Sequence, residues 1–151
     1  VLGISKNIPT QPSHFNSIKL QKKLIHKIVD IKDKKNIQKI FKQFKPDFVF
    51  HLAAQSLVNK SYISPKLTWE TNLLGTINLL EALNELKNKC CSIFITSDKC
   101  YENQEWEWGY RESDKLGGND PYSASKGSAE LVFKSYFESF FSKSKIKKIR
   151  N

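Results

Sequence analysis

The sequence has few cysteines, arginines and glycines and no methionine, and these scarcities exclude several classes of protein. Among 151 residues it has no methionine, two arginines, three cysteines and six glycines. The cysteines, Cys90, Cys91 and Cys100, are odd in number and match neither a disulfide framework nor a paired metal site. We therefore expect a reducing compartment, with the cytoplasm as the default. His14 and His26 have no partners at metal-ligand spacing, so we predict no metal.

Long apolar runs are also missing. No stretch approaches the roughly 18 residues that a membrane-spanning helix needs, and no signal peptide is visible. We expect no membrane association. Because the chain begins at Val1 and has no methionine at all, we expect it to be an internal fragment of a longer protein, whose true start could carry a signal.

Positive charge is in excess, with a formal net charge of +10 from 25 basic and 15 acidic residues. All the basic residues except Arg111 and Arg150 are lysines, and they are spread over segments such as 32–35 and 143–148. Phosphate recognition favours arginine, and nucleic-acid binders usually place their cations among stacking aromatics. We interpret the lysines as a solvated surface, with steering of an anionic small molecule as the alternative, and expect no nucleic-acid partner.

The apolar residues alternate between the spacing of strands and the spacing of helices. Near-continuous apolar character in residues 48–54 indicates a strand covered on both faces, as parallel sheets require. Asp33 and Asp120 are suited to be helix N-caps, and Pro65 is suited to a first turn. The expected strands are residues 1–5, 24–31, 48–54, 91–96 and 146–151, and the expected helices are residues 33–46, 65–89 (the longest) and 120–141.

This alternation predicts an α/β fold with right-handed crossovers and a mostly parallel sheet. In such folds, ligands bind in the crevice beyond the carboxyl ends of the strands. Asp30, residues 53–55 and residues 97–99 all follow predicted strands. We therefore expect these three segments to point at one site.

Tyr122 and Lys126 stand one helical turn apart at the start of the last predicted helix, so their side chains share a face. A lysine cation beside a phenol favours the phenolate and lowers the pKa of a phenol from its free value of about 10. Such a tyrosine can act as a base or an acid near neutral pH. This spacing is common in purely structural helices, but the hydroxyl of Ser97 at a neighbouring strand end supports an active site.

Longer strings around these residues resemble a known family. The string YSASK at residues 122–126, with Ser97 upstream and Leu52-Ala53-Ala54 ending the earlier strand, is similar to the extended short-chain dehydrogenase/reductase family of nucleotide-sugar enzymes. Within this family, the chain looks like the 4,6-dehydratases that act on CDP-glucose. The strings that carry this closer resemblance are residues 96–103 (TSDKCYEN), 105–106, 108–112 (WGYRE), 116–118 (LGG), 120–123 (DPYS), 50–55 with 61–62, and 71–72 with 75–76.

The resemblance implies a Rossmann-type, doubly wound parallel sheet in which residues 1–151 are a partial NAD-binding domain. Val1 corresponds to the second strand of the family's sheet, so the first strand with its glycine-rich turn and the C-terminal substrate part are expected outside this chain. In the sheet order 3-2-1-4-5-6, that first strand joins the two halves. We therefore expect the isolated 151 residues to fold poorly, to bind NAD weakly or not at all, and to show no turnover. The intact protein is expected to be a homo-oligomer.

The resemblance also implies roles in converting CDP-glucose to its 4-keto-6-deoxy product. Tyr122 would take the proton of the C4 hydroxyl, Lys126 would assist it and hold the nicotinamide ribose, and Ser97 would bind the same C4 oxygen. Asp98 would protonate the departing C6 hydroxyl. Lys99 would remove the C5 proton as a partly desolvated neutral amine, although related dTDP-sugar dehydratases have Glu here. The alternative for Lys99 is a cation that only positions Asp98 or the substrate.

For NAD, the resemblance points to two strand ends and one helix. Asp30 would accept from the adenine amino group, with the backbone of Ile31 beside the ring; an aspartate that only caps the next helix is the alternative. Thr71 matches a position near the nicotinamide, and packing within its helix explains it equally well. The residues expected along the ribose and nicotinamide are Leu52, Ala53, Ala54 and Gln55.

Other chemically capable side chains have structural explanations. We expect His51 to be a hydrogen-bonded core histidine and Cys100 to pack rather than react. Trp106, Trp108 and Tyr110 form either a lid on the substrate side or an anchor for a long loop. Two alternative functions stay open: a nucleotide-sugar epimerase or reductase of the same superfamily, and a non-catalytic dinucleotide-binding module.

Overall fold

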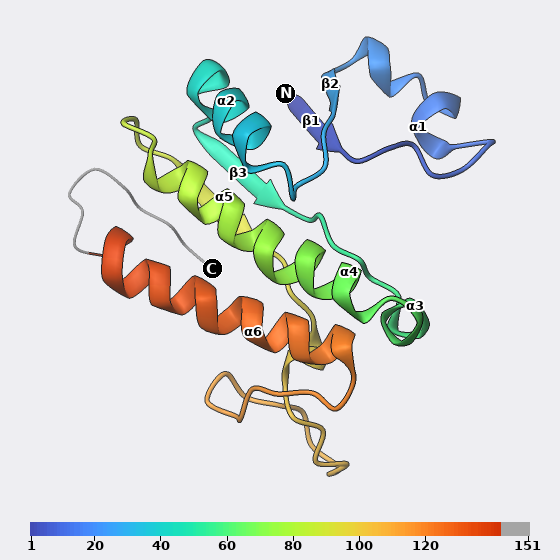
Figure 1. The fold of residues 1–151 in the computed structure, drawn as a ribbon, viewed down its shortest axis with the longest axis vertical. Coiled ribbons are helices and arrows are strands. Elements are labelled where there is room, and N and C mark those ends of the chain that lie inside the picture. Colours follow the sequence, from blue (N-terminus) through green and yellow to red (C-terminus); the bar gives the residue numbers. More distant parts are fainter. Residues whose placement is uncertain (143–151) are drawn as a thin grey trace.

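The computed structural model describes residues 1–142, which form two parallel strand pairs and a layer of helices against them (Figure 1). β1 (Leu2–Ser5) pairs with β2 (Ile25–Ile28), and β3 (Phe48–His51) pairs with β4 (Cys91–Phe94). Within the described residues, no strand joins one pair to the other. The predicted α/β fold with parallel strands is confirmed, and its two separate pairs agree with an incomplete Rossmann fold.

Helix α2 (Lys34–Phe44) shows how local signals set the ends of an element. Oδ1 of Asp33 accepts the backbone N–H of Asn36 at 3.1 Å, which satisfies one of the free donors of the first turn. At the other end Lys45 adopts a left-handed conformation, with φ of 48°, directly before Pro46. The predicted start and end of this helix are confirmed.

The helix predicted over residues 65–89 is wrong in its length and its regularity. The helix ends at Asn84. The predicted helix was too long because the apolar spacing continues past this end, where Leu86 is buried in the core from the following turn. A π-helical turn also interrupts it and brings Asn72 into the interior. It is not the longest helix either: its three contiguous parts have 5, 5 and 10 residues, one fewer in total than the 16 residues of α6 and the 5 of the π-helical turn that continues it. The elements are α4 (Pro65–Trp69), the π-helical turn (Glu70–Leu74) and α5 (Gly75–Asn84).

The hydrophobic core lies where α2, α5 and α6 (Pro121–Tyr136) meet on one side of the strands. Val49 of β3 and Phe94 of β4 pack against it from the sheet. This core holds α6 above the end of β4. Its buried members are Ile37, Phe41, Leu79, Leu80, Ala82, Leu83, Leu86, Cys90, Phe133 and Phe141.

The prediction that the strand at residues 48–54 is covered on both faces is wrong for the described part of the chain. Phe48 is 68% exposed and Phe50 is 61% exposed, whereas His51 is buried and Val49 packs against the core. Successive side chains of a strand point to opposite faces, and the helices α2, α5 and α6 pack on one face of this strand. The apolar character of the other face is therefore not matched by packing within residues 1–142.

Several short turns were not predicted. They lie between the longer elements, where the sequence signals were too brief to separate a helical turn from a loop. The predicted strand at residues 146–151 lies outside the described residues. Between residues 1 and 142, no helix combines the length and the apolar character that crossing a membrane requires. The short turns are α1 (His14–Ser17), a 3-10 turn (Leu20–Lys22) and α3 (Val58–Ile63). A π-helical turn (Phe137–Phe141) continues α6 to the end of the helix predicted over residues 120–141.

Candidate active site

The segment after β4 carries three of the predicted catalytic side chains. Ser97 caps a 3-10 helix (Asp98–Cys100): its Oγ accepts the backbone N–H of Lys99 at 3.2 Å and donates to Oδ1 of Asp98 at 2.9 Å. The Asp98 side chain is 82% exposed, the Lys99 side chain is 53% exposed, and Lys99 Nζ lies 3.9 Å from Asp98 Oδ2. The three side chains are together, but the partial desolvation expected for Lys99 is not seen among residues 1–142.

Helix α6 brings Tyr122 and Lys126 to the same end of the sheet. Its first turn is held by Asp120, whose Oδ1 accepts the backbone N–H of Tyr122 at 2.9 Å, so the predicted cap is confirmed. Tyr122 and Lys126 are both buried. Lys126 Nζ donates to the carbonyl oxygen of Ile95, just beyond β4, at 3.5 Å. The lysine therefore contacts the segment that leads into Ser97.

Gly127 lets α6 approach this segment closely. A Cβ at position 127 would lie 3.0 Å from the carbonyl oxygen of Cys100, which is tighter than ordinary side-chain contacts. The same carbonyl accepts the backbone N–H of Gly117 at 2.9 Å. Cys100 is buried, and burial, followed by the charge of Glu130, raises the pKa of its thiol. These observations agree with the packing role predicted for Cys100.

A buried hydrogen-bond network links the end of β3 to the helix that carries Tyr122. Asn72 Oδ1 accepts the backbone N–H of Gln55 at 2.8 Å, and Asn72 Nδ2 donates to Ser125 Oγ at 2.9 Å. Ser125 Oγ in turn donates to the carbonyl oxygen of Tyr122 at 2.7 Å. The sequence analysis included Asn72 in the resemblance string at residues 71–72 and in the helix predicted over residues 65–89, but gave its side chain no role. An amide among the apolar residues of that helix was a signal that could have found this connection.

The residues predicted to bind the adenine end of NAD lie beside the start of α5. Asp30 Oδ1 accepts the backbone N–H of Lys32 at 3.0 Å, and Asp30 Oδ2 lies 3.4 Å from Lys6 Nζ. A Cβ on Gly75 would lie only 2.6 Å from Cγ2 of Ile31, so α5 packs directly onto this segment. The binding role of Asp30 and Ile31 stays a prediction.

The remaining cofactor residues follow β3. Leu52 is 71% exposed, Ala53 is exposed and Ala54 is half-buried, so the small side chains leave this stretch of backbone open. Gln55 is buried and its side chain donates to Thr68 Oγ1 at 3.0 Å. Gln55 therefore holds the loop in place, and direct contact between its side chain and a cofactor stays a prediction. Thr71 is half-buried within the π-helical turn.

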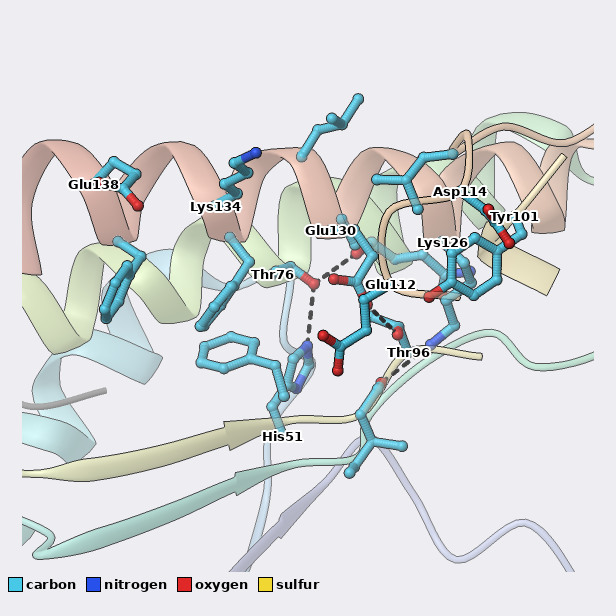
Figure 2. A pocket seen from close by; sticks show the side chains of 18 of the residues that line it. His51, Thr76, Thr96, Tyr101, Glu112, Asp114, Lys126, Glu130, Lys134 and Glu138 are labelled. Carbon is cyan, nitrogen blue, oxygen red and sulfur yellow. Dashed lines mark hydrogen bonds between the residues drawn. The ribbon is translucent and has the colours of Figure 1, made fainter. Parts of the chain in front are cut away.

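A cavity of about 800 Å³ lies between α6 and the strand ends (Figure 2). Ala53 and Thr96 line it from the strand ends, and Lys126 and Glu130 line it from α6. Among the described residues, its lining does not include Ser97 or Tyr122, so it reaches only part of the predicted cluster. Burial lowers the pKa of Lys126, and the nearby charge of Glu130 opposes this change.

His51 behaves as the hydrogen-bonded core histidine that was predicted. It is buried, and its Nε2 lies 3.1 Å from Thr76 Oγ1. Thr76 Oγ1 donates its own proton to the carbonyl oxygen of Asn72 at 2.6 Å, so Nε2 must carry the proton of the neutral ring. Burial, assisted by the charge of Lys126, lowers the pKa of His51 to about 4. The ring is therefore neutral near pH 7.

The titration of His51 is expected to destabilise the fold as the pH falls. In the unfolded chain, His51 has a pKa of about 6.5. Above that pH, the ring is neutral in both the folded and the unfolded state. Between that pH and about 4, only the unfolded state is protonated, so the free energy of unfolding falls by at most about 3 kcal/mol. Denaturant unfolding of the full-length protein at a series of pH values, compared with His51→Gln, measures this loss. Equal pH dependence in the two proteins would contradict the assignment.

The loop of residues 101–120, between the segment with Ser97 and helix α6, is held by contacts among its own aromatic residues. The rings of Tyr101 and Tyr110 stack with centroids 5.2 Å apart, and Trp106 lies 5.5 Å from Tyr110. The Tyr110 hydroxyl donates to Asn103 Oδ1 at 3.1 Å. These contacts agree with an anchoring role for Trp106 and Tyr110, and the alternative of a lid on the substrate side stays a prediction. Trp108, which contacts Trp106, remains 66% exposed.

Comparison with known proteins finds relatives that are named as nucleotide-sugar dehydratases and epimerases. The chain is 47% identical over 141 residues to the CDP-glucose 4,6-dehydratase of Salmonella typhimurium, covering 93% of this chain and 39% of that protein. It is 30% identical over 126 residues to the CDP-paratose 2-epimerase of Salmonella typhi, covering 74% of this chain and 37% of that protein. The chain thus spans well under half the length of these curated relatives.

The solved structures agree on the fold. DesIV, a dTDP-glucose 4,6-dehydratase from Streptomyces venezuelae solved with NAD bound, superposes with a TM-score of 0.78 at 24% identity, covering 93% of this chain and 42% of that chain. The sequence model of the family described as GDP-mannose 4,6 dehydratase matches residues 5–147, which is nearly the whole sequence. This chain therefore belongs to the GDP-mannose 4,6 dehydratase family.

Proposed function

We propose that this chain is part of an NAD-dependent nucleotide-sugar 4,6-dehydratase, and that its substrate is CDP-glucose. The observation that carries the proposal is the 47% identity to a CDP-glucose 4,6-dehydratase over 93% of the chain. The structure supports it, because the segment with Ser97, Asp98 and Lys99 and the helix with Tyr122 and Lys126 lie at the same end of the sheet. Residues 1–151 are proposed to form part of the NAD-binding domain.

The residues present fit NAD. Asp30 follows the parallel strand β2 with its carboxylate partly exposed, the small Ala53 and Ala54 leave the backbone after β3 open, and Lys126 lines the same cavity as Ala53. The carboxyl ends of parallel strands are where such folds bind dinucleotides. In this arrangement Asp30 holds the adenine end and Lys126 holds the nicotinamide ribose. When bound, NAD accepts hydride from C4 of the sugar and returns it at C6.

Three side chains serve the oxidation. The Tyr122 phenolate takes the proton of the C4 hydroxyl, and the Lys126 cation favours that phenolate. Ser97 Oγ donates a hydrogen bond to the same C4 oxygen, for which it must turn from Asp98 Oδ1, its present acceptor at 2.9 Å. The exposed position of Asp98 permits that change.

Two side chains serve the elimination of water. The 4-keto group makes the C5 proton acidic, and Lys99 is proposed to remove it while Asp98 protonates the leaving C6 hydroxyl. Lys99 Nζ and Asp98 Oδ2 lie 3.9 Å apart, which supports a joint role in the elimination. Because both are exposed among the described residues, substrate binding must supply the desolvation that a neutral lysine requires.

The intact protein is proposed to be a cytoplasmic homo-oligomer. Cys91 and Cys100 are thiols in the structure, in keeping with a reducing compartment. Leu131 and Phe140, on α6 and the turn that continues it, are 57% and 50% exposed, and such apolar surface suits a contact between subunits.

The experiment that tests the proposed function is a direct assay of the full-length protein. With NAD present, CDP-glucose should give the 4-keto-6-deoxy product, which is followed by its absorbance in alkali, and dTDP-glucose should give much less. Preference for dTDP-glucose would overturn the substrate assignment but keep the reaction. Formation of a C4 epimer, or binding of NAD without any turnover, would support the epimerase or the non-catalytic alternative instead.

A further inference from the structure

Glu130 lies one helical turn after Lys126 on α6 and has no part in the roles described so far. Its carboxylate accepts a hydrogen bond from the hydroxyl of Thr96, the residue that directly precedes Ser97. Thr96, Lys126 and Glu130 line the same cavity, and Figure 2 shows all three among its lining residues. One carboxylate thus contacts the strand-end segment and lies on the same helix face as the buried lysine.

Lys126 depends on a nearby negative charge because it is buried. Burial lowers the pKa of Lys126. The largest effect that raises this pKa is the negative charge of the Glu130 carboxylate. His51, which faces Lys126 from β3, is neutral near pH 7, and burial keeps Cys100 a neutral thiol. The remaining titratable groups are Tyr122, one turn earlier on α6, and the cavity-lining Tyr101, Glu112, Asp114, Lys134 and Glu138.

We propose that Glu130 is a positioning residue, which fixes Thr96 against α6 and keeps Lys126 protonated beside Tyr122. The inference rests on the proposed function, in which the charge of Lys126 assists Tyr122. Holding Thr96 also holds Ser97, the next residue, relative to Tyr122. Without the carboxylate, Lys126 loses its proton at a lower pH, and the cation that the proposed function requires near Tyr122 is lost over the same range.

The first test measures Lys126 without any turnover. Isotope-edited NMR of the Lys126 ε-carbon, assigned with Lys126→Arg, follows its titration in the full-length protein. Glu130→Gln keeps the size of the side chain and its acceptor for Thr96, and it should move the Lys126 midpoint to lower pH. Glu138→Gln removes the same charge about two turns further on, in the π-helical turn that continues α6, and should leave the midpoint in place. An unchanged midpoint in Glu130→Gln would overturn the electrostatic part of the proposal.

The second test measures the pH dependence of kcat on CDP-glucose. Glu130→Gln should move the alkaline limb of the profile to lower pH, in step with the Lys126 titration. Thr96→Val should reduce kcat at every pH, by up to about 10²-fold, and Thr96→Ser should restore it. Wild-type kcat in Thr96→Val would overturn the positioning part. If the wild-type protein does not convert CDP-glucose, the proposed function fails, while the NMR titration still decides whether Glu130 controls Lys126.

Discussion

Replacing Tyr122 by phenylalanine in the full-length protein is expected to lower kcat on CDP-glucose by about 10²- to 10⁴-fold, which is the usual contribution of a positioned acid or base. The phenyl ring fills the same buried site, so the fold should persist. KM should change little, because the lost interaction acts in the transition state. Steady-state kinetics measure both quantities. A kcat within about tenfold of wild type would remove Tyr122 from the mechanism.

Tyr136→Phe is the matched control for that substitution. Tyr136 lies on the same helix, and its hydroxyl donates to Glu81 Oε1 at 3.0 Å, away from the strand ends. Loss of a hydrogen bond to a charged group should lower the free energy of unfolding by about 1 to 3 kcal/mol and leave kcat unchanged. The pair of variants separates the chemistry of a phenol at position 122 from general damage to α6.

Lys99→Ala is expected to abolish most of the exchange of the C5 proton with solvent, and to lower kcat by about 10²-fold or more. Oxidation at C4 should persist, because Ser97, Tyr122 and Lys126 are untouched. NMR of the sugar in deuterated water measures the exchange. Undiminished exchange would mean that Lys99 is a cation that only positions Asp98 or the substrate, which is the alternative role for this residue.

Lys115→Ala controls for the loss of one positive charge near the site. Lys115 Nζ pairs with Glu102 Oε2 at 2.8 Å at the base of the aromatic loop, and its side chain is 77% exposed. An exposed pair of this kind contributes little to stability. Wild-type exchange is therefore expected in Lys115→Ala. Similar losses in both lysine variants would point to a general effect of charge rather than to proton transfer by Lys99.

The sequence predicted those parts of the fold that depend on neighbours along the chain. The caps at Asp33 and Asp120 and the end of α2 before Pro46 are correct, because the hydrogen bonds that define them join residues a few positions apart. The grouping of Ser97, Asp98 and Lys99 followed from the same local logic. That Lys126 contacts the chain after β4 followed from parallel topology, which places helix starts near strand ends.

The features that the sequence did not predict depend on packing between distant segments. Apolar alternation cannot say whether both faces of a strand find partners, so the exposure of Phe48 and Phe50 was missed. The π-helical turn buries Asn72, whose side chain bonds to Ser125 far along the sequence. The contact between Thr96 and Glu130 also joins residues from distant segments. The solvation of Lys99 was missed for the same reason, since burial depends on the surroundings and not on residue type.

One measurement tests the central proposal most directly: the fate of deuterium placed at C4 of CDP-glucose when the full-length protein acts on it with NAD. We predict that NMR of the product finds the label at C6, next to a keto group at C4, because oxidation and reduction occur at different carbons in one active site. Label retained at C4 in an epimerised sugar, or no conversion of CDP-glucose at all, would contradict the assignment of this chain to a nucleotide-sugar 4,6-dehydratase.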